Sequence, residues 1–169
     1  DIFANQQRFV KKLLPYEIFM ANIEAGNDEQ LIIKALVESF HLRICGNSKP
    51  GCICCVATLE DIYRKYGYDT LQRSLRLCIA TWEGDTDSLT SNILRGIAHL
   101  IVAYKDGLKD DMFVEKVGRF SPREIGRIAK ERKAGSMGYA EAMLTLYNKK
   151  SSSKGTLKWA KLYENKQVI

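Results

Sequence analysis

The sequence lacks the signatures of several large functional classes. No run approaches the roughly 20 apolar residues that cross a bilayer, and no secretory signal is recognisable. There is no G-x-S-x-G nucleophile elbow and no G-x-G-x-x-G or G-K-[ST] phosphate loop. Of the two histidines, His99 falls in the most apolar stretch and His41 at the end of an expected helix. We therefore expect neither an enzyme nor a membrane protein, and no cofactor.

The five cysteines do not suggest a disulfide framework. An odd number in a chain of this length, without a secretion signal, favours a reducing environment and predicts a cytoplasmic protein. Four of them lie with His41 within fifteen residues, which raises the question of a zinc site. In a strand, however, Cys52 and Cys54 would face one side and Cys55 the other. Buried cysteines acting as small hydrophobes are the favoured interpretation. The weaker alternative is a metal site, with His41, Cys45, Cys52 and Cys54 as candidate ligands.

The pattern of apolar residues predicts helices through most of the chain. With 169 residues, 46% of them hydrophobic, the chain is long enough for one buried core. Segment 42–57 is different, because two β-branched or cysteine-rich runs flank a Pro-Gly turn and predict a small hairpin. We expect an all-α fold, a compact multi-helix domain with a small β-hairpin insertion over residues 1–150. A linker and a C-terminal tail helix follow over 151–169. The expected helices are 1–14, 15–26, 29–42, 58–67, 68–82, 89–107 (the most apolar, and so the central one), 110–120, 121–132 and one ending at Lys150.

The net charge of +6 is distributed unevenly along the chain. From Lys116 onward there are thirteen Lys and Arg against four Glu, a balance of +9, so residues 1–115 carry −3. Such a polarised molecule predicts a polyanionic partner at the C-terminal end, most often nucleic acid. An anionic membrane is not expected, because these helices lack the large exposed apolar face that interfacial binding needs.

Residues 121–133 concentrate this positive charge on one helix face. Ser121 and Glu124 form a capping-box pattern, and Pro122 occupies the first helical position. At about 100° per residue, the apolar residues fall on one side and the basic residues form a row on the other. We expect this row to face outward and to contact phosphates. The predicted contacts are Arg123, Arg127, Lys130 and Lys133, with Lys149 and Lys150 at the end of the next helix.

Two segments also fit a helix-turn-helix pattern. In Thr58–Trp82, a turn glycine precedes a helix that would expose Gln72, Arg73 and Arg76, which could reach base edges or phosphates in a major groove. Ser121–Lys150 is more basic, but its first helix is longer than the motif usually tolerates. Helix–glycine–helix joins occur throughout all-α proteins, so plain bundle packing is the favoured interpretation of both segments.

Several stretches carry a family resemblance. They are FANQQRFVKKLLPYEIFMANIEAGN, LEDIYRKYGYDTLQRSLRLCIATWEGD, ILRGIAHLIVAYKDGLKDD, and FSPREIGRIAKER with AEAMLTLYNKK. Over most of residues 1–150 the chain resembles the helical region that follows the ParB-like (ParB/sulfiredoxin-type) nuclease domain in uncharacterised phage and mobile-element proteins. The G-x-H-R-type element of the ParB-like module is absent. The resemblance therefore implies that this module would lie upstream of Asp1, and it assigns no catalytic residue to this chain.

Together these observations predict a DNA-associated accessory domain that binds duplex DNA mainly through backbone phosphates. Phosphate contacts position a protein without reading sequence, so binding should weaken steeply as salt rises. The alternative is an interaction module without nucleic-acid contact, whose helices form a homodimer or hold an upstream ParB-like domain. A third possibility is a module stabilised by a metal.

Overall fold

A computed structural model describes residues 12–152 and 154–164 and confirms the predicted all-α fold. The helix expected over residues 1–14 lies outside these ranges, except for its last three residues, which are not helical. The helices of the described part are α2 (Pro15–Glu24), α3 (Asp28–Ser39), α4 (Val56–Tyr66), α5 (Tyr68–Trp82), α6 (Ser91–Tyr104), α7 (Asp110–Val117), α8 (Pro122–Arg132), α9 (Gly135–Asn148) and α10 (Trp159–Glu164), with a 3-10 turn η1 (Lys105–Gly107).

The two short strands are parallel, so the expected hairpin is wrong. β1 (Arg43–Ile44) pairs with β2 (Cys52–Ile53), and Arg43 lies opposite Cys52. The N–H of Cys45 donates to the carbonyl of Ile53 at 3.0 Å. The N–H of Cys52 donates to the carbonyl of Lys49, which closes a tight turn before β2. The Pro-Gly signal marks this turn correctly. It does not determine the direction in which the next strand pairs, which depends on the path of the whole loop.

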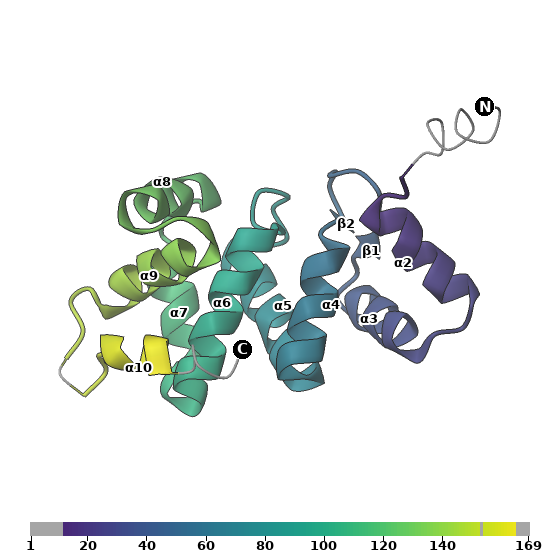
Figure 1. The fold of residues 1–169 in the computed structure, drawn as a ribbon. Coiled ribbons are helices and arrows are strands. Elements are labelled where there is room, and N and C mark those ends of the chain that lie inside the picture. The colour runs from purple at the N-terminus through teal and green to yellow at the C-terminus, as the bar shows by residue number, and fades with distance from the viewer. Residues whose placement is uncertain (1–11, 153, 165–169) are drawn as a thin grey trace, which may run out of the picture.

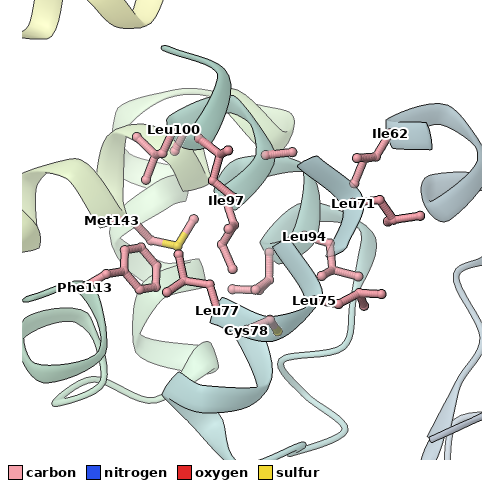
Figure 2. Close-up of a cluster of buried hydrophobic side chains, with 14 of the residues drawn as sticks. Ile62, Leu71, Leu75, Leu77, Cys78, Leu94, Ile97, Leu100, Phe113 and Met143 are labelled. Atoms are coloured by element: carbon pink, nitrogen blue, oxygen red, sulfur yellow. The ribbon is translucent and has the colours of Figure 1, made fainter. Parts of the chain in front are cut away.

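The helices form an elongated row with α6 near its centre (Figure 1). At one end lie α2, α3 and the strands, and at the other lie α8 and α9. Helix α6 packs against α5 on one side and α9 on the other, as expected for the most apolar helix. Its Leu94 and Ile97 are fully buried with Leu75 of α5 and Met143 of α9 (Figure 2). This shared core fixes the positions of the helices that carry the charged surface residues.

Two glycines allow α9 to approach its neighbours closely. A Cβ on Gly96 of α6 would lie 2.7 Å from Cε of Met143 and 3.2 Å from the backbone nitrogen of Ala140. A Cβ on Gly138 of α9 would collide with the carbonyl of Lys133, directly after α8. Because the backbone contact at Gly138 leaves no room for a side chain and the contacts at Gly96 leave little, α6, α8 and α9 form one tightly packed unit. This packing sets the position of α8 relative to the start of α6.

The C-terminal segment packs on the same unit. Leu157 and Leu162 are buried, and α10 contacts α6. The side chain of Asn148 donates to the Leu157 carbonyl at 2.9 Å and accepts from its N–H at 2.8 Å. The hydroxyl of Tyr104 donates to the carbonyl of Lys158 at 2.7 Å. The expected tail helix is therefore present as α10, and it is docked against the helical domain.

Candidate functional site

Helix α8 begins with the capping box that the sequence predicts. The N–H of Glu124 donates to Oγ of Ser121 at 3.2 Å, and the N–H of Ser121 donates to Oε2 of Glu124 at 2.8 Å. Two otherwise unpaired amides of the first turn are satisfied in this way. Ile125 and Ala129 are buried against the rest of the domain. The basic side of α8 is consequently directed outward, as the periodicity predicts.

The basic row of α8 lines a cavity of about 740 Å³. Arg123, Arg127 and Lys130 line it from successive turns of the helix. Thr90, Ser91 and Asn92 at the start of α6 line the same cavity. Asp87, from the loop before α6, and Tyr139 of α9 also line it. We call this cavity the α8–α6 groove. The sequence predicts the cationic row of α8, but it does not predict that the start of α6 lies opposite this row.

The start of α6 adds a second source of positive potential to the α8–α6 groove. Thr90 is the N-cap residue of this 14-residue helix, and its side chain makes no capping hydrogen bond. The first-turn amides of a helix have no partner within the helix, and the helix dipole makes this end positive. Backbone amides in such a position commonly bind phosphate or carboxylate groups. Their juxtaposition with three basic side chains favours an anionic ligand.

One acidic residue partly offsets this charge. Nε of Arg123 lies 3.2 Å from Oδ2 of Asp87, but the Arg123 side chain is 84% exposed, so water screens the pair. Within the described residues, Arg127 and Lys130 form no ion pair, and both are exposed. The groove therefore retains free cations that can contact a ligand without breaking an internal interaction.

The other predicted contacts in the C-terminal third lie apart from this row. Lys133 follows the end of α8, and its Nζ lies 5.4 Å from the centre of the Tyr163 ring of α10. Its neighbour Arg132 lies 4.8 Å over the ring of Trp159. Lys149 and Lys150 line a different cavity beside the end of α7. The positive charge of the C-terminal third is thus divided among several surfaces.

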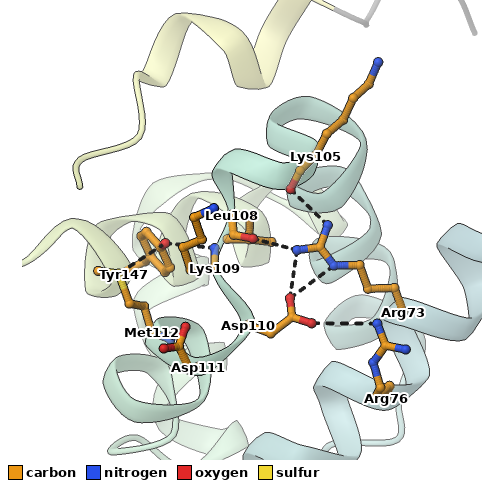
Figure 3. A network of polar contacts seen from close by, with 9 residues as sticks. All are labelled: Arg73, Arg76, Lys105, Leu108, Lys109, Asp110, Asp111, Met112 and Tyr147. Carbon is orange, nitrogen blue, oxygen red and sulfur yellow. Dashed lines mark hydrogen bonds and ion pairs between the residues drawn. The ribbon is translucent and has the colours of Figure 1, made fainter. Parts of the chain in front are cut away.

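Arg73 serves the fold. Its guanidinium donates to Oδ1 of Asp110 at 2.7 Å, to the carbonyl of Leu108 at 2.6 Å and to that of Lys105 at 2.9 Å (Figure 3). These bonds join α5 to the segment between α6 and α7. Arg76 lies 3.8 Å from the same carboxylate and is more exposed, and Gln72 is partly buried. Because its donors are engaged internally, Arg73 is not part of the candidate binding surface.

Neither predicted helix-turn-helix presents its second helix as that motif requires. A recognition helix must expose a face that can enter the major groove. Helix α9 packs against α6, α7 and α8, and most of its residues are buried. Helix α5 packs against α4, α6 and α7, and Arg73 on its outer side is engaged as described above. Bundle packing, the favoured interpretation of both segments, accounts for these helices.

The cysteine cluster contains one disulfide, which differs from the free, buried cysteines that the sequence predicts. Cys45 directly follows β1 and Cys52 opens β2, and the parallel register brings their Cα atoms to 5.6 Å and joins their sulfurs. Cys54, Cys55 and Cys78 are free thiols. Among the described residues, no group of three or more His, Cys, Asp or Glu side chains is arranged to hold a metal ion. His41 lies exposed at a left-handed backbone position after α3.

Comparison with other proteins identifies a family and no specific relative. No helix in the described ranges has the length and apolarity needed to span a membrane. No curated protein and no solved structure shows significant similarity to the chain. A family model described as a family of unknown function (DUF6551) matches residues 2–158. Because this match covers most of the sequence, the chain belongs to the DUF6551 family.

Proposed function

We propose that this protein binds duplex DNA through backbone phosphates, using the α8–α6 groove as its contact surface. The observation that carries the proposal is the meeting of three cations with an uncapped helix start in one cavity. Arg123 and Lys130 are seven residues apart, so the row spans about 10 Å along α8. A row of this length can contact more than one phosphate of a DNA strand.

The chemistry of the groove predicts affinity without sequence preference. Arginine binds phosphate oxygens through a planar fork of donors, lysine acts as a point charge, and helix amides add directed hydrogen bonds. None of these groups reads a base edge. Three phosphate contacts would give a slope of about −2.7 for the logarithm of affinity against the logarithm of salt concentration. Binding should therefore be readily measurable at low salt and weak at physiological salt.

The resemblance to the region that follows ParB-like domains suggests where such binding would be used. We propose a non-catalytic accessory role, in which this domain holds DNA near a ParB-like module of the same phage or mobile-element protein, in the cytoplasm. Weak contacts suffice for this role, because tethering two modules raises their effective local concentration. Sequence selection or chemistry would then belong to the other module.

The test is a titration of a fluorescent duplex with wild type and two charge-reversal variants. Arg123→Glu/Arg127→Glu removes two cations of the groove. Lys149→Glu/Lys150→Glu changes the net charge equally at a different surface. At about 50 mM salt we expect the first variant to lose at least about tenfold in affinity and the second less than about threefold. Equal losses would show that overall charge, and not this groove, attracts the DNA. No binding by wild type would reject the proposal.

A second candidate function has support at the opposite end of the molecule (Figure 1). Large apolar side chains are exposed just before α2 and on α2 and α3, among them Leu14 at 57% and Ile18 at 47%. Exposed apolar groups of this kind favour association with another protein surface. In this alternative the domain is an interaction module. Light scattering over a range of concentrations tests it, because self-association predicts a mass that rises above 19.2 kDa.

A further inference from the structure

A second, smaller cavity lies one helical turn from the α8–α6 groove. It has a volume of about 140 Å³ and is lined by Lys65 of α4, Arg95 and His99 of α6, and Ser136 of α9, among others. Asn92, which lines the groove, is three residues from Arg95 on α6. Tyr139, which also lines the groove, is three residues from Ser136 on α9. Residues three apart on a helix share a face, so the two cavities are neighbours along α6 and α9. We call the smaller one the His99 pocket.

Arg95 is held in a fixed position at the His99 pocket. Its Nη2 lies 2.7 Å from Oδ2 of Asp61, and its Nε donates to Oγ of Ser91 at 3.1 Å. These bonds use two of the five donors of the guanidinium and leave the others for a ligand. Asp61 is the one acidic residue that lines the pocket, and its charge is already paired with Arg95. The unpaired charge of the pocket is therefore positive and comes from Lys65.

His99 and Ser136 complete the set of donors. Nε2 of His99 lies 3.1 Å from Oγ of Ser136, which is in the first turn of α9. The N-cap residue of α9 is Ala134, which has no side-chain group to cap the helix amides. Burial, with the nearby charges of Arg95 and Lys65, lowers the pKa of His99. At neutral pH this shift favours the neutral imidazole, because a third positive charge is unfavourable there.

We propose that the His99 pocket is a subsite for a phosphate monoester, the terminal phosphate of a nucleic-acid strand whose backbone lies along α8. This inference rests on the proposed function, since the strand is the one bound in the α8–α6 groove. The pocket offers a guanidinium, an ammonium, an imidazole, a hydroxyl and helix amides, which are groups that bind phosphate. It is much smaller than the groove, so it suits the end of a strand and excludes a duplex that continues past it.

Occupation of the pocket should change the protonation of His99. A phosphate dianion beside the ring stabilises the imidazolium and opposes the effect of Arg95 and Lys65. The pKa of His99 should therefore rise when phosphate binds. The groups facing the ring are Asp61, Lys65 and Tyr66 from α4, Arg95 from α6 and Ser136 from α9. Because Asp61 is paired and the other side chains are cationic or neutral, phosphate would be the group that reverses the local potential.

The main experiment compares two versions of one blunt duplex, with 5′-phosphate or 5′-hydroxyl ends. Wild type should bind the phosphorylated duplex at least about fivefold more tightly. Lys65→Gln, at an exposed position, should weaken binding of the phosphorylated duplex more than binding of the hydroxyl duplex, and so reduce this preference. Arg123→Glu/Arg127→Glu should weaken both duplexes by the same factor and keep the preference. Equal affinity of wild type for the two duplexes would overturn the subsite and leave the proposed function intact.

A second measurement decides the case in which wild type binds neither duplex. Proton NMR follows the rings of His99 and His41 during a titration with inorganic phosphate, and His41, exposed after α3, is the internal control. A rise in the pKa of His99 alone supports the pocket even though the proposed function has failed. An unchanged His99 pKa overturns the pocket as well. If the pocket binds inorganic phosphate but wild type shows no preference for 5′-phosphate ends, the phosphate that the pocket binds is not the end of a nucleic-acid strand, and the proposal is overturned.

Discussion

Nε of Arg123 on α8 lies 3.2 Å from Oδ2 of Asp87 in the loop before α6. The pair joins the two segments that line the α8–α6 groove. Both side chains are well exposed, so the pair adds little to stability. Its effect on a ligand is larger, because Asp87 is the acidic residue among those lining the groove. Asp87 therefore weakens the attraction of the groove for an anion.

Replacing Asp87 should strengthen DNA binding. Asp87→Asn removes the negative charge, keeps the size of the side chain and frees Arg123 for a phosphate. We expect affinity for duplex DNA to rise about two- to fivefold at low salt, and the gain to shrink as salt rises. Asp69→Asn, at an exposed position in the first turn of α5, makes the same change of net charge away from the groove and should have a smaller effect. An equal gain in both variants, or none in Asp87→Asn, would contradict the role assigned to the groove.

Arg73 should contribute far more to stability than Arg76. Arg73→Ala removes the donor to the Leu108 carbonyl, the hydrogen bonds to the Asp110 carboxylate, and one of the two donors to the Lys105 carbonyl. We expect a loss of about 2–4 kcal/mol in the free energy of unfolding, measured with urea. Arg76→Ala removes an exposed contact of 3.8 Å and should cost less than about 1 kcal/mol. Similar losses in the two variants would show that the Arg73 network is not a principal link between α5 and α7.

The three free thiols should differ in reactivity. Burial raises the pKa of Cys55 and Cys78 to about 12, and the sulfur of Cys55 lies 3.7 Å from the carbonyl of Leu89. The thiolate is the reactive form, so alkylation of the folded protein at pH 8 should modify Cys54 first. Cys78, which is fully buried, should react only in denaturant, the half-buried Cys55 more slowly than Cys54, and Cys45 and Cys52 only after reduction. Peptide mass spectrometry checks this order, and rapid native labelling of Cys78 would contradict it.

The same pKa shift predicts a loss of stability at high pH. In the unfolded chain the Cys78 thiol ionises near its ordinary pKa of about 8.5, whereas in the folded protein it ionises only near 12. Its contribution is thus fully present below about pH 8.5 and is lost as pH rises toward 12. Urea unfolding should show a smaller decrease between pH 8 and pH 10.5 for Cys78→Ala than for wild type. An identical decrease would exclude Cys78 as a source of the pH dependence.

The features that were predicted correctly depend on interactions within a few residues. The capping box of Ser121 and Glu124 spans three residues, and the two faces of α8 follow from helical periodicity. The central position of α6 follows from its apolar composition. In each case the physical cause, an amide needing an acceptor or an apolar side chain avoiding water, acts within one segment. The helical fold and the cationic row could therefore be predicted from the sequence.

The tertiary structure decided what each charged or reactive side chain meets. Arg73 and Arg127 both lie on helices with one buried face, but Arg73 is bound to Asp110, 37 positions away, and Arg127 lines an open groove. The disulfide between Cys45 and Cys52 depends on a parallel register that no local signal indicates. The partnership of α8 with the start of α6 depends on close packing at Gly96 and Gly138. These outcomes result from how whole helices pack, because long-range contacts depend on the geometry of all the segments between them.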